Sequence, residues 1–113
     1  MSVKKIVLFI LALVFLAPSL SAAQVPGVTA KEVVVGVSTP LSGPAALWGV
    51  TAMGIKAWAD YINDQGGING RKIKVIVKDD GYNPARSMAN LQEMKNEVFC
   101  VTGLLGSAPC SAS

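Results

Sequence analysis

The chain has 113 residues, of which 51% are apolar, and a formal net charge of +3. Both figures are dominated by the N-terminus: 17 of the first 23 residues are apolar, against 41 of the remaining 90, and Lys4 and Lys5 carry two of the three net charges. The remaining 90 residues therefore have the composition of an ordinary globular domain, which excludes intrinsic disorder and provides no basic surface for nucleic acid or anionic lipid.

Residues 1–23 have the three parts of a secretory signal peptide. Lys4 and Lys5 precede twelve consecutive apolar residues, Ile6 to Ala17, and the segment ends in the small residues Ser21, Ala22 and Ala23. A helix of twelve residues spans about 18 Å, which is too short for a hydrocarbon core of about 30 Å. We therefore predict cleavage after Ala23, export, and no stable membrane insertion after cleavage. A buried N-terminal helix or an uncleaved anchor is the alternative.

Residues 24–65 predict an extended segment, a strand and a helix. A β-branched run over residues 32–39 is typical of a strand that is buried on both faces, and the two prolines and the glycine of residues 40–44 indicate a loop. Helical periodicity over residues 47–65 predicts an amphipathic helix, which Gly66 and Gly67 end. Its predicted inward residues are Thr51, Ile55, Trp58 and Ile62, and its predicted outward residues are Lys56, Asp60, Asn63 and Asp64.

Residues 66–113 repeat this alternation. We expect a strand over residues 72–78, a loop over 79–82, a helix from Asn83 to about residue 96, a strand over 98–103, and a helix that begins at Ser107. The order βαβαβ predicts an α/β fold with a parallel sheet and right-handed crossovers. The predicted inward residues of the second long helix are Ala85, Met88, Leu91 and Met94.

Three loops are expected at the carboxyl edge of this sheet, where open parallel sheets bind ligands. They span residues 40–49, 79–83 and 104–108. The first holds Ser42 and Trp48, and the third holds Gly106 and Ser107 at the start of a helix, where free N–H groups favour an anion. Together these four residues could bind a small carboxylate under an aromatic ring. The alternatives are a helix cap for Ser107 and core packing for Trp48.

The remaining reactive side chains predict little chemistry. The chain has no histidine, which excludes Cys2His2 zinc sites and the nucleophiles that a histidine activates within this chain. Neither GxGxxG nor a P-loop occurs, so we expect no catalytic residue, no metal and no cofactor. Export to an oxidising compartment permits a disulfide between Cys100 and Cys110. Cys100 lies in an apolar run, however, which favours a buried thiol there. Asp79 and Asp80 could hold Mg²⁺, but the following Gly81 favours a turn.

The order of short motifs resembles a known family. The motifs are PLSGPAA from Pro40, WG at Trp48, YINDQGGINGRKI from Tyr61, and DD followed two residues later by NP from Asp79. Together they resemble the beginning of the leucine/isoleucine/valine-binding type of periplasmic solute-binding proteins, which serve ABC importers. The resemblance covers about residues 28–107. It implies a type I periplasmic-binding-protein fold, with residues 24–113 as the opening part of lobe one of a two-lobed clamp.

The resemblance also implies a function and a site. It implies a protein without enzymatic activity that captures branched-chain amino acids, or a related small carboxylate or amide, in the periplasm for a membrane permease. Trp48 matches the residue that packs on the ligand side chain, and Ser107 matches the hydroxyl residue that receives the ligand carboxylate. Several members have a cysteine at the place of Tyr82 or Gly106, and this chain lacks the intra-lobe disulfide that they form.

Two other classes of function stay open from the residues. One is a doubly wound α/β enzyme that uses Asp79 and Asp80 with a metal ion. The other is an interaction fragment, whose last strand and helix dock on a separately encoded remainder of the fold.

The signal peptide leads to a direct prediction. We expect the exported chain to begin at Gln24 or within two residues of it, because Ser21 and Ala23 are the small residues that a signal peptidase requires. N-terminal sequencing of the exported product checks this expectation. An exported chain that still begins with Met1 would contradict it.

Overall fold

A computed structural model describes residues 24–112, and the predicted signal peptide with its cleavage position lies outside them. The elements follow in the predicted order, two strand–helix units and a third strand before the final helix. Their bounds are β1 (Glu32–Thr39), the 3-10 helix η1 (Ala46–Gly49), α2 (Val50–Asp64), β2 (Lys72–Asp79), α3 (Pro84–Met94), β3 (Cys100–Thr102) and α4 (Ser107–Ala112). Within residues 24–112, no helix combines the length and the apolar character that crossing a membrane requires.

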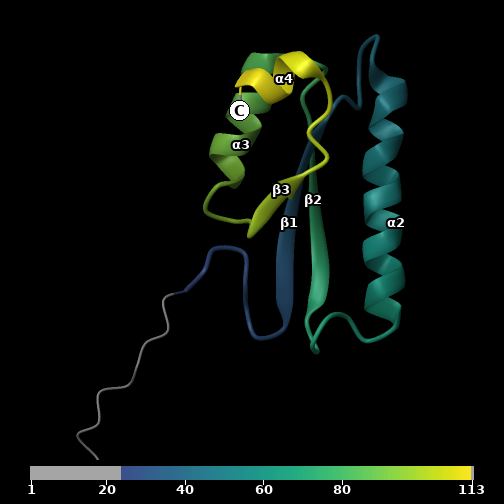
Figure 1. Ribbon diagram of the computed structural model, residues 1–113, viewed down its shortest axis with the longest axis vertical. Coiled ribbons are helices and arrows are strands. Elements are labelled where there is room, and N and C mark those ends of the chain that lie inside the picture. The colour runs from purple at the N-terminus through teal and green to yellow at the C-terminus, as the bar shows by residue number, and fades with distance from the viewer. Residues whose placement is uncertain (1–23, 113) are drawn as a thin grey trace, which may run out of the picture.

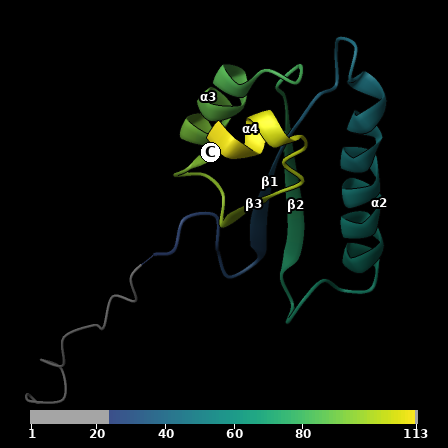
Figure 2. The same ribbon diagram turned by 45° about the horizontal axis from the view of Figure 1, so that its top comes forward.

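The three strands form one parallel sheet in the order β2-β1-β3, as the βαβαβ pattern predicts (Figure 1). β1 is the central strand and pairs with β2 over its whole length, from Glu32 opposite Lys72 to Thr39 opposite Asp79. The sheet has helices on both sides, with α2 on one side and α3 and α4 on the other (Figures 1 and 2). Because all three strands are parallel, the loops that follow them leave the sheet at the same edge.

The main core lies between the sheet and α3. Val34 of β1, Met94 of α3 and Val98 are buried together, and Ile76, Leu91 and Val101 pack against them. Gly36 makes this close packing possible, since a Cβ there would lie 3.0 Å from the Sδ of Met94. The glycine in the middle of β1 therefore lets α3 approach the sheet closely.

The buried face of α2 differs from the predicted one. Ala52 and Ala59 are buried, whereas Thr51 and Trp58, which the periodicity places inward, are exposed. The buried stripe is thus rotated by one residue, although Ile55 and Ile62 remain partly buried on it. The physical reason is size, because two alanines let the helix lie close to the sheet while the bulk of the indole stays outside.

Asn63 fixes the end of α2 to β2. Its side-chain amide donates to the carbonyl oxygen of Ile73 at 2.7 Å, and its Oδ1 accepts from the backbone N–H of Ile73 at the same distance. The helical periodicity predicts Asn63 on the solvent side of the helix, and that prediction is wrong. The Asn63 side chain thus makes the pair of hydrogen bonds with the Ile73 backbone that a neighbouring strand would otherwise make.

The helix α3 begins as predicted but turns a different face inward at its start. Asn83 is the N-cap, and its Oδ1 accepts from the N–H groups of Ala85 and Arg86 at 2.9 and 3.2 Å. Ala85 is exposed and Ser87 is buried, so the prediction of an inward Ala85 is wrong. The cap fixes where the helix begins, whereas the packing of Met94 against the sheet sets its rotation.

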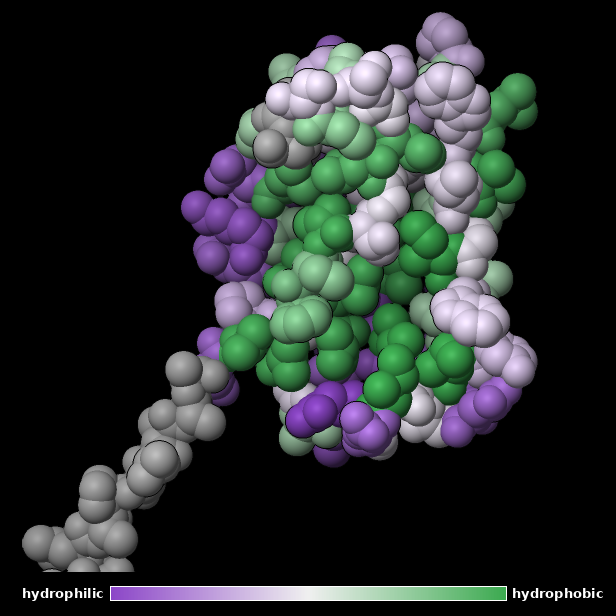
Figure 3. Space-filling model, in the orientation of Figure 1, coloured by the Kyte–Doolittle hydropathy of each residue, from purple (hydrophilic) through white to green (hydrophobic). Residues whose placement is uncertain are grey.

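One side of the sheet is uncovered next to α2. Figure 3 shows apolar residues gathered over the sheet beside this helix. A hollow of about 270 Å³ lies there, between residues of β1, β2, β3 and the turn before β2. Cys100 lines this hollow and is exposed. The prediction of a buried Cys100 is therefore wrong, because no other element of residues 24–112 covers this end of β3.

The packing of Met94 can be tested against a matched methionine. Met94 is fully buried and Met53 is exposed, yet both lie in helices. We expect Met94→Ala to lower the free energy of unfolding by about 2–5 kcal/mol, because it leaves a cavity in the core. Met53→Ala should change it by less than about 0.5 kcal/mol. Urea denaturation of both variants measures this, and equal losses would refute the assigned core.

Candidate functional site

Three loops meet at the carboxyl edge of the sheet. Trp48 in η1 comes from the loop after β1, and Tyr82 comes from the loop after β2. Their rings contact each other edge to face, with centroids 5.4 Å apart and an interplanar angle of 73°. Such pairs contribute about 0.5–1.5 kcal/mol beyond the area that they bury. Trp48 nevertheless stays 53% exposed, so core packing does not account for its indole.

Tyr82 also contacts the third loop. A Cβ on Gly106 would overlap the Tyr82 ring, so the ring lies directly on the glycine backbone. Tyr82 has a φ of +62°, a left-handed conformation that a bulky residue rarely adopts, and its N–H donates to the Oδ1 of Asp80 at 2.8 Å. The sequence pattern does not place Tyr82 among the site residues. Only the structure shows that its ring joins the loops after β1 and β3.

Asp79 holds the first two loops together. It is the last residue of β2, and its Oδ1 accepts from the N–H groups of Leu41 at 2.8 Å and Gly81 at 2.9 Å. Its Oδ2 accepts from the Ser42 hydroxyl at 2.5 Å and lies 3.5 Å from the Arg86 guanidinium. The carboxylate thus fixes the start of the loop after β1 relative to the loop after β2.

These bonds favour the ionised carboxylate. The Ser42 hydroxyl, followed by the N–H groups of Leu41 and Gly81, lowers the pKa of Asp79 from 3.8 to about 2. Because the pKa is lower in the folded state, ionised Asp79 stabilises the fold above pH 3.8, and this contribution is lost as the pH falls towards 2. The loops are therefore held in place throughout the neutral and mildly acidic range.

Asp80 faces the other way, into a buried polar cluster. Its Oδ2 accepts from the Ser38 hydroxyl at 3.0 Å, and the Asn90 side chain donates to the same hydroxyl oxygen at 3.1 Å. The two adjacent carboxylates therefore point to different partners, and both are used in holding loops. This arrangement favours the turn role over a shared metal ion, and residues 24–112 hold no group of three or more side chains suited to a metal.

The four predicted ligand residues, Ser42, Trp48, Gly106 and Ser107, all lie at this edge. They differ in their hydrogen bonding and exposure. The Ser42 hydroxyl already donates to Asp79, so its oxygen is left to accept. Ser107 is exposed and is the first residue of α4, and the carbonyl oxygen of Gly106 accepts from the N–H of Cys110 at 3.1 Å. The N-cap position therefore belongs to Gly106 rather than to Ser107.

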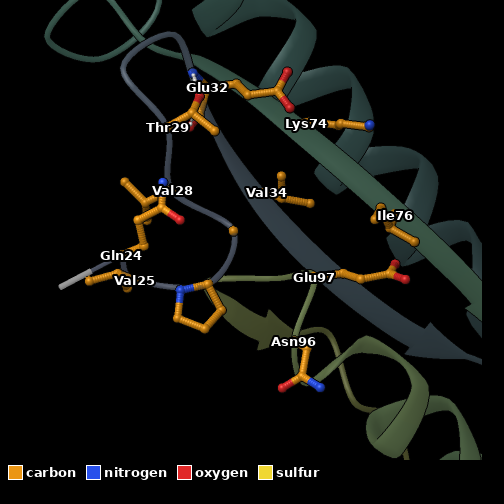
Figure 4. Close-up of a pocket in the computed structure, with 12 residues that line it drawn as sticks. Gln24, Val25, Val28, Thr29, Glu32, Val34, Lys74, Ile76, Asn96 and Glu97 are labelled. Atoms are coloured by element: carbon orange, nitrogen blue, oxygen red, sulfur yellow. Dashed lines mark hydrogen bonds between the residues drawn. The ribbon is translucent and has the colours of Figure 1, made fainter.

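A larger hollow lies far from this edge. It has a volume of about 610 Å³ and is lined by residues 24–29, the first half of β1, the middle of β2 and the turn after α3 (Figure 4). Lys74 lies in it with Glu32 and Glu97, and most of its other side chains are apolar. The strands begin at this end of the sheet, so the hollow lacks the convergence of loops found at the carboxyl edge.

Comparison with known proteins identifies the family. The model of the family described as "Periplasmic binding protein" matches residues 32–113, which include every strand and helix of the structure. The chain belongs to the periplasmic binding protein family. Among curated members, it is 37% identical over 59 residues to the "Leu/Ile/Val-binding protein homolog 1" of Brucella abortus. It is 41% identical over 59 residues to an "Amino acid binding protein" of Pseudomonas aeruginosa.

Solved structures of other family members share this fold. A fatty acid ABC transporter substrate-binding protein from Thermomonospora curvata is 34% identical, with a TM-score of 0.75, over 79% of this chain and 23% of that one. The branched-chain amino acid transporter substrate-binding protein LivJ from Streptococcus pneumoniae, in complex with isoleucine, is 28% identical, with a TM-score of 0.68, over 73% of this chain and 24% of that one. The parallel α/β sheet of this periplasmic binding protein is therefore that of the type I fold.

The matches cover little of the relatives. The alignments with the two curated proteins include 51% of this chain and 16% of each relative. The match to the family, over residues 32–113, nevertheless runs through all three loops and so includes the sheet edge at which Trp48 and Tyr82 meet.

The hydrogen bond from Ser42 to Asp79 leads to a prediction about the pKa of Asp79. We expect Ser42→Ala to raise the pKa of Asp79 from about 2 towards 3.8, because the Ser42 hydroxyl is the largest cause of the lowered value. NMR titration of the side-chain carboxyl carbons measures this pKa. Ser38→Ala is the matched control, since the Ser38 hydroxyl donates to Asp80 instead. An unchanged Asp79 pKa in Ser42→Ala would contradict the assignment.

Proposed function

We propose that this chain supplies one face of the ligand site in the substrate-binding component of an ABC import system. The proposed ligand is a branched-chain amino acid, or a related small carboxylate or amide, captured in the periplasm. The observation that carries the proposal is the meeting of three loops around the Trp48–Tyr82 pair, at the sheet edge where parallel α/β folds bind ligands. Relatives described as Leu/Ile/Val-binding or bound to isoleucine support the ligand class.

Each loop has a separate part in the proposed site. The half-exposed indole of Trp48 offers an apolar face to the ligand side chain. Gly106 and Ser107 lie beyond Tyr82, where the Ser107 hydroxyl and nearby backbone N–H groups can donate to a carboxylate. Asp79 contributes indirectly, because it holds Ser42 and the loop that carries Trp48.

The ligand site is proposed to be completed by a second lobe. Residues 24–113 would form part of lobe one of a longer, two-lobed protein, after removal of residues 1–23 as a signal peptide. Two observations support this. The chain matches only 16–24% of the length of its relatives, and one side of its sheet is uncovered at β3. The complete protein would deliver its ligand to a membrane permease.

A one-sided site predicts weak binding. Ligand pockets commonly bury more than about 70% of the ligand surface, and a single lobe leaves most of that surface in water. We therefore expect this chain to bind leucine or isoleucine with a Kd in the millimolar range, about 4 kcal/mol in free energy. NMR titration with either amino acid should shift amide signals of residues 40–49, 81–83 and 104–108.

The two tryptophans make a matched pair of variants for this titration. Trp48→Ala should abolish the shifts, whereas Trp58→Ala, which removes an indole from the outer side of α2, should leave them unchanged. Shifts confined to the hollow at residues 24–29 would place the ligand elsewhere. No response to leucine, isoleucine or a panel of small carboxylates and amides would contradict the proposed ligand class, and a sub-micromolar Kd would contradict the need for a second lobe.

A further inference from the structure

A two-residue turn leads into β2 and carries an asparagine followed by a glycine. Asn69 and Gly70 have φ values of +50° and +76°, and Ile68 and Arg71 on either side of them exchange backbone hydrogen bonds at 2.8 and 3.0 Å. Two positive φ values in succession are those of a type I′ turn, for which Asn-Gly is a preferred pair. The turn lies at the end of the sheet where β2 begins, opposite the edge that carries the candidate site (Figure 1).

The side chain of Asn69 and the N–H of Gly70 are both free to react. The turn is closed by the backbone groups of Ile68 and Arg71, and within residues 24–112 neither the Asn69 amide nor the Gly70 N–H makes a hydrogen bond. Both residues are exposed, and a Cβ at Gly70 would have no atom within 4 Å. Water therefore reaches the amide carbon and the backbone nitrogen, and no side chain shields one from the other.

An asparagine amide in this setting can be lost by reaction with the backbone. After hydroxide removes its proton, the Gly70 nitrogen attacks the Cγ of Asn69, and the new N–Cγ bond closes a five-membered succinimide ring. The Cγ–Nδ2 bond breaks, and the leaving nitrogen takes a proton from water and departs as ammonia. Water then opens the ring at one of its two carbonyl carbons, which gives aspartate or isoaspartate. One water is taken up and one ammonia is released, with no change of oxidation state.

Three of the other four asparagines of the chain are held by hydrogen bonds. The amide of Asn63 bonds to the backbone of Ile73 through both its oxygen and its nitrogen. Asn83 caps α3 through its Oδ1 and is followed by a proline, which has no N–H with which to attack. Asn90 donates from its Nδ2 to two oxygen atoms, at 3.1 and 3.2 Å. Each of these amides must first lose its bonds before it can react.

Asn96 is the most informative comparison, because it is exposed like Asn69. The residue after it is Glu97, whose side chain crowds the backbone nitrogen. The N–H of Glu97 also donates to the carbonyl oxygen of Met94 at 2.8 Å. The attacking group that is free at Gly70 is therefore occupied at Glu97.

Ring closure requires the turn to open. The carbonyl group of Asn69 must rotate to bring the Gly70 nitrogen onto Cγ, and this rotation is incompatible with the left-handed turn conformation. An exposed turn that is closed by two hydrogen bonds opens at a far lower cost than a helix or a core strand. Motif, exposure and local opening thus coincide at this one turn of residues 24–112.

We propose that Asn69 is a site of spontaneous modification, at which the chain deamidates through a succinimide formed with Gly70. The reagents are water and hydroxide, so the site needs neither a partner protein nor a ligand. The inference is independent of the proposed function, because the turn and the ligand site lie at opposite ends of β2.

Isoaspartate does not fit this turn. It adds one atom to the main chain between Ile68 and Arg71, whose two hydrogen bonds fix the length of the turn. The neighbouring backbone leaves no slack, since a Cβ on Gly67 would overlap the carbonyl oxygen of Arg71. The modification is therefore expected to open the turn and to loosen the start of β2, where the N–H of Lys72 donates to the carbonyl oxygen of Lys31 at 2.8 Å.

Peptide mapping of the aged chain tests the site. The full chain is kept at mildly alkaline pH, and mass spectrometry follows the exchange of ammonia for water at all five asparagines of one sample. We expect Asn69 to react at least about tenfold faster than Asn96, because the N–H that follows Asn96 must first give up its hydrogen bond. Reaction at Asn69 that is no faster than at Asn96 would refute the proposal.

A variant separates the effect of the motif from that of the free N–H. Glu97→Gly gives Asn96 a following glycine but leaves the bond from that N–H to Met94 in place. Asn96 should therefore remain slower than Asn69 in this variant, and circular dichroism checks that the variant keeps the helical content of the parent chain. Equal rates at the two asparagines would overturn the role assigned to the free N–H of Gly70.

The stability of the products tests the effect on the turn. Chromatography separates the isoaspartate form from the parent chain, and we expect this form to unfold at a lower urea concentration than Asn69→Asp. That variant is the matched control, because it carries the same new charge on an unaltered main chain. Equal urea midpoints would contradict the opening of the turn.

Discussion

The pairing of β1 on both of its edges is the constraint on which the rest of the structure depends. β1 is bonded to β2 along its whole length and to β3 over three residues, always in parallel. Parallel pairing sends the loops after all three strands to one edge. It also sets Thr39 opposite Asp79, so the carboxylate that ends β2 reaches the N–H groups of the loop that follows β1. A slip of one residue would exchange Asp79 for Asp80, whose side chain is required on the opposite face.

The sequence predicts those parts of the fold whose signals are local. The β-branched run of β1 and the Asn83–Pro84 start of α3 depend on neighbouring residues alone, and both are confirmed. Which side of a helix is buried depends on what lies across from it. For that reason the inward positions of Trp58 and Ala85 were predicted wrongly, even though the helices themselves were predicted correctly.

The candidate site shows the same division between local and distant signals. The loops at the carboxyl edge follow from the order of strands and helices, so Trp48 and Ser107 could be named from the sequence. Tyr82 could not, because its contact with Gly106 joins loops separated by 24 residues and leaves no periodic pattern. Cys100 likewise required the structure, because its exposure depends on which elements lie over the end of β3.

The Tyr82–Gly106 contact joins the second and third loops without a covalent bond. At these two places the family resemblance puts a cysteine in several members, whereas here an aromatic ring lies on a glycine backbone. A covalent link needs an oxidant to form and is cut by thiols. Ring packing needs neither, so the second and third loops can associate at any redox potential, and reducing agents would leave this corner of the protein intact.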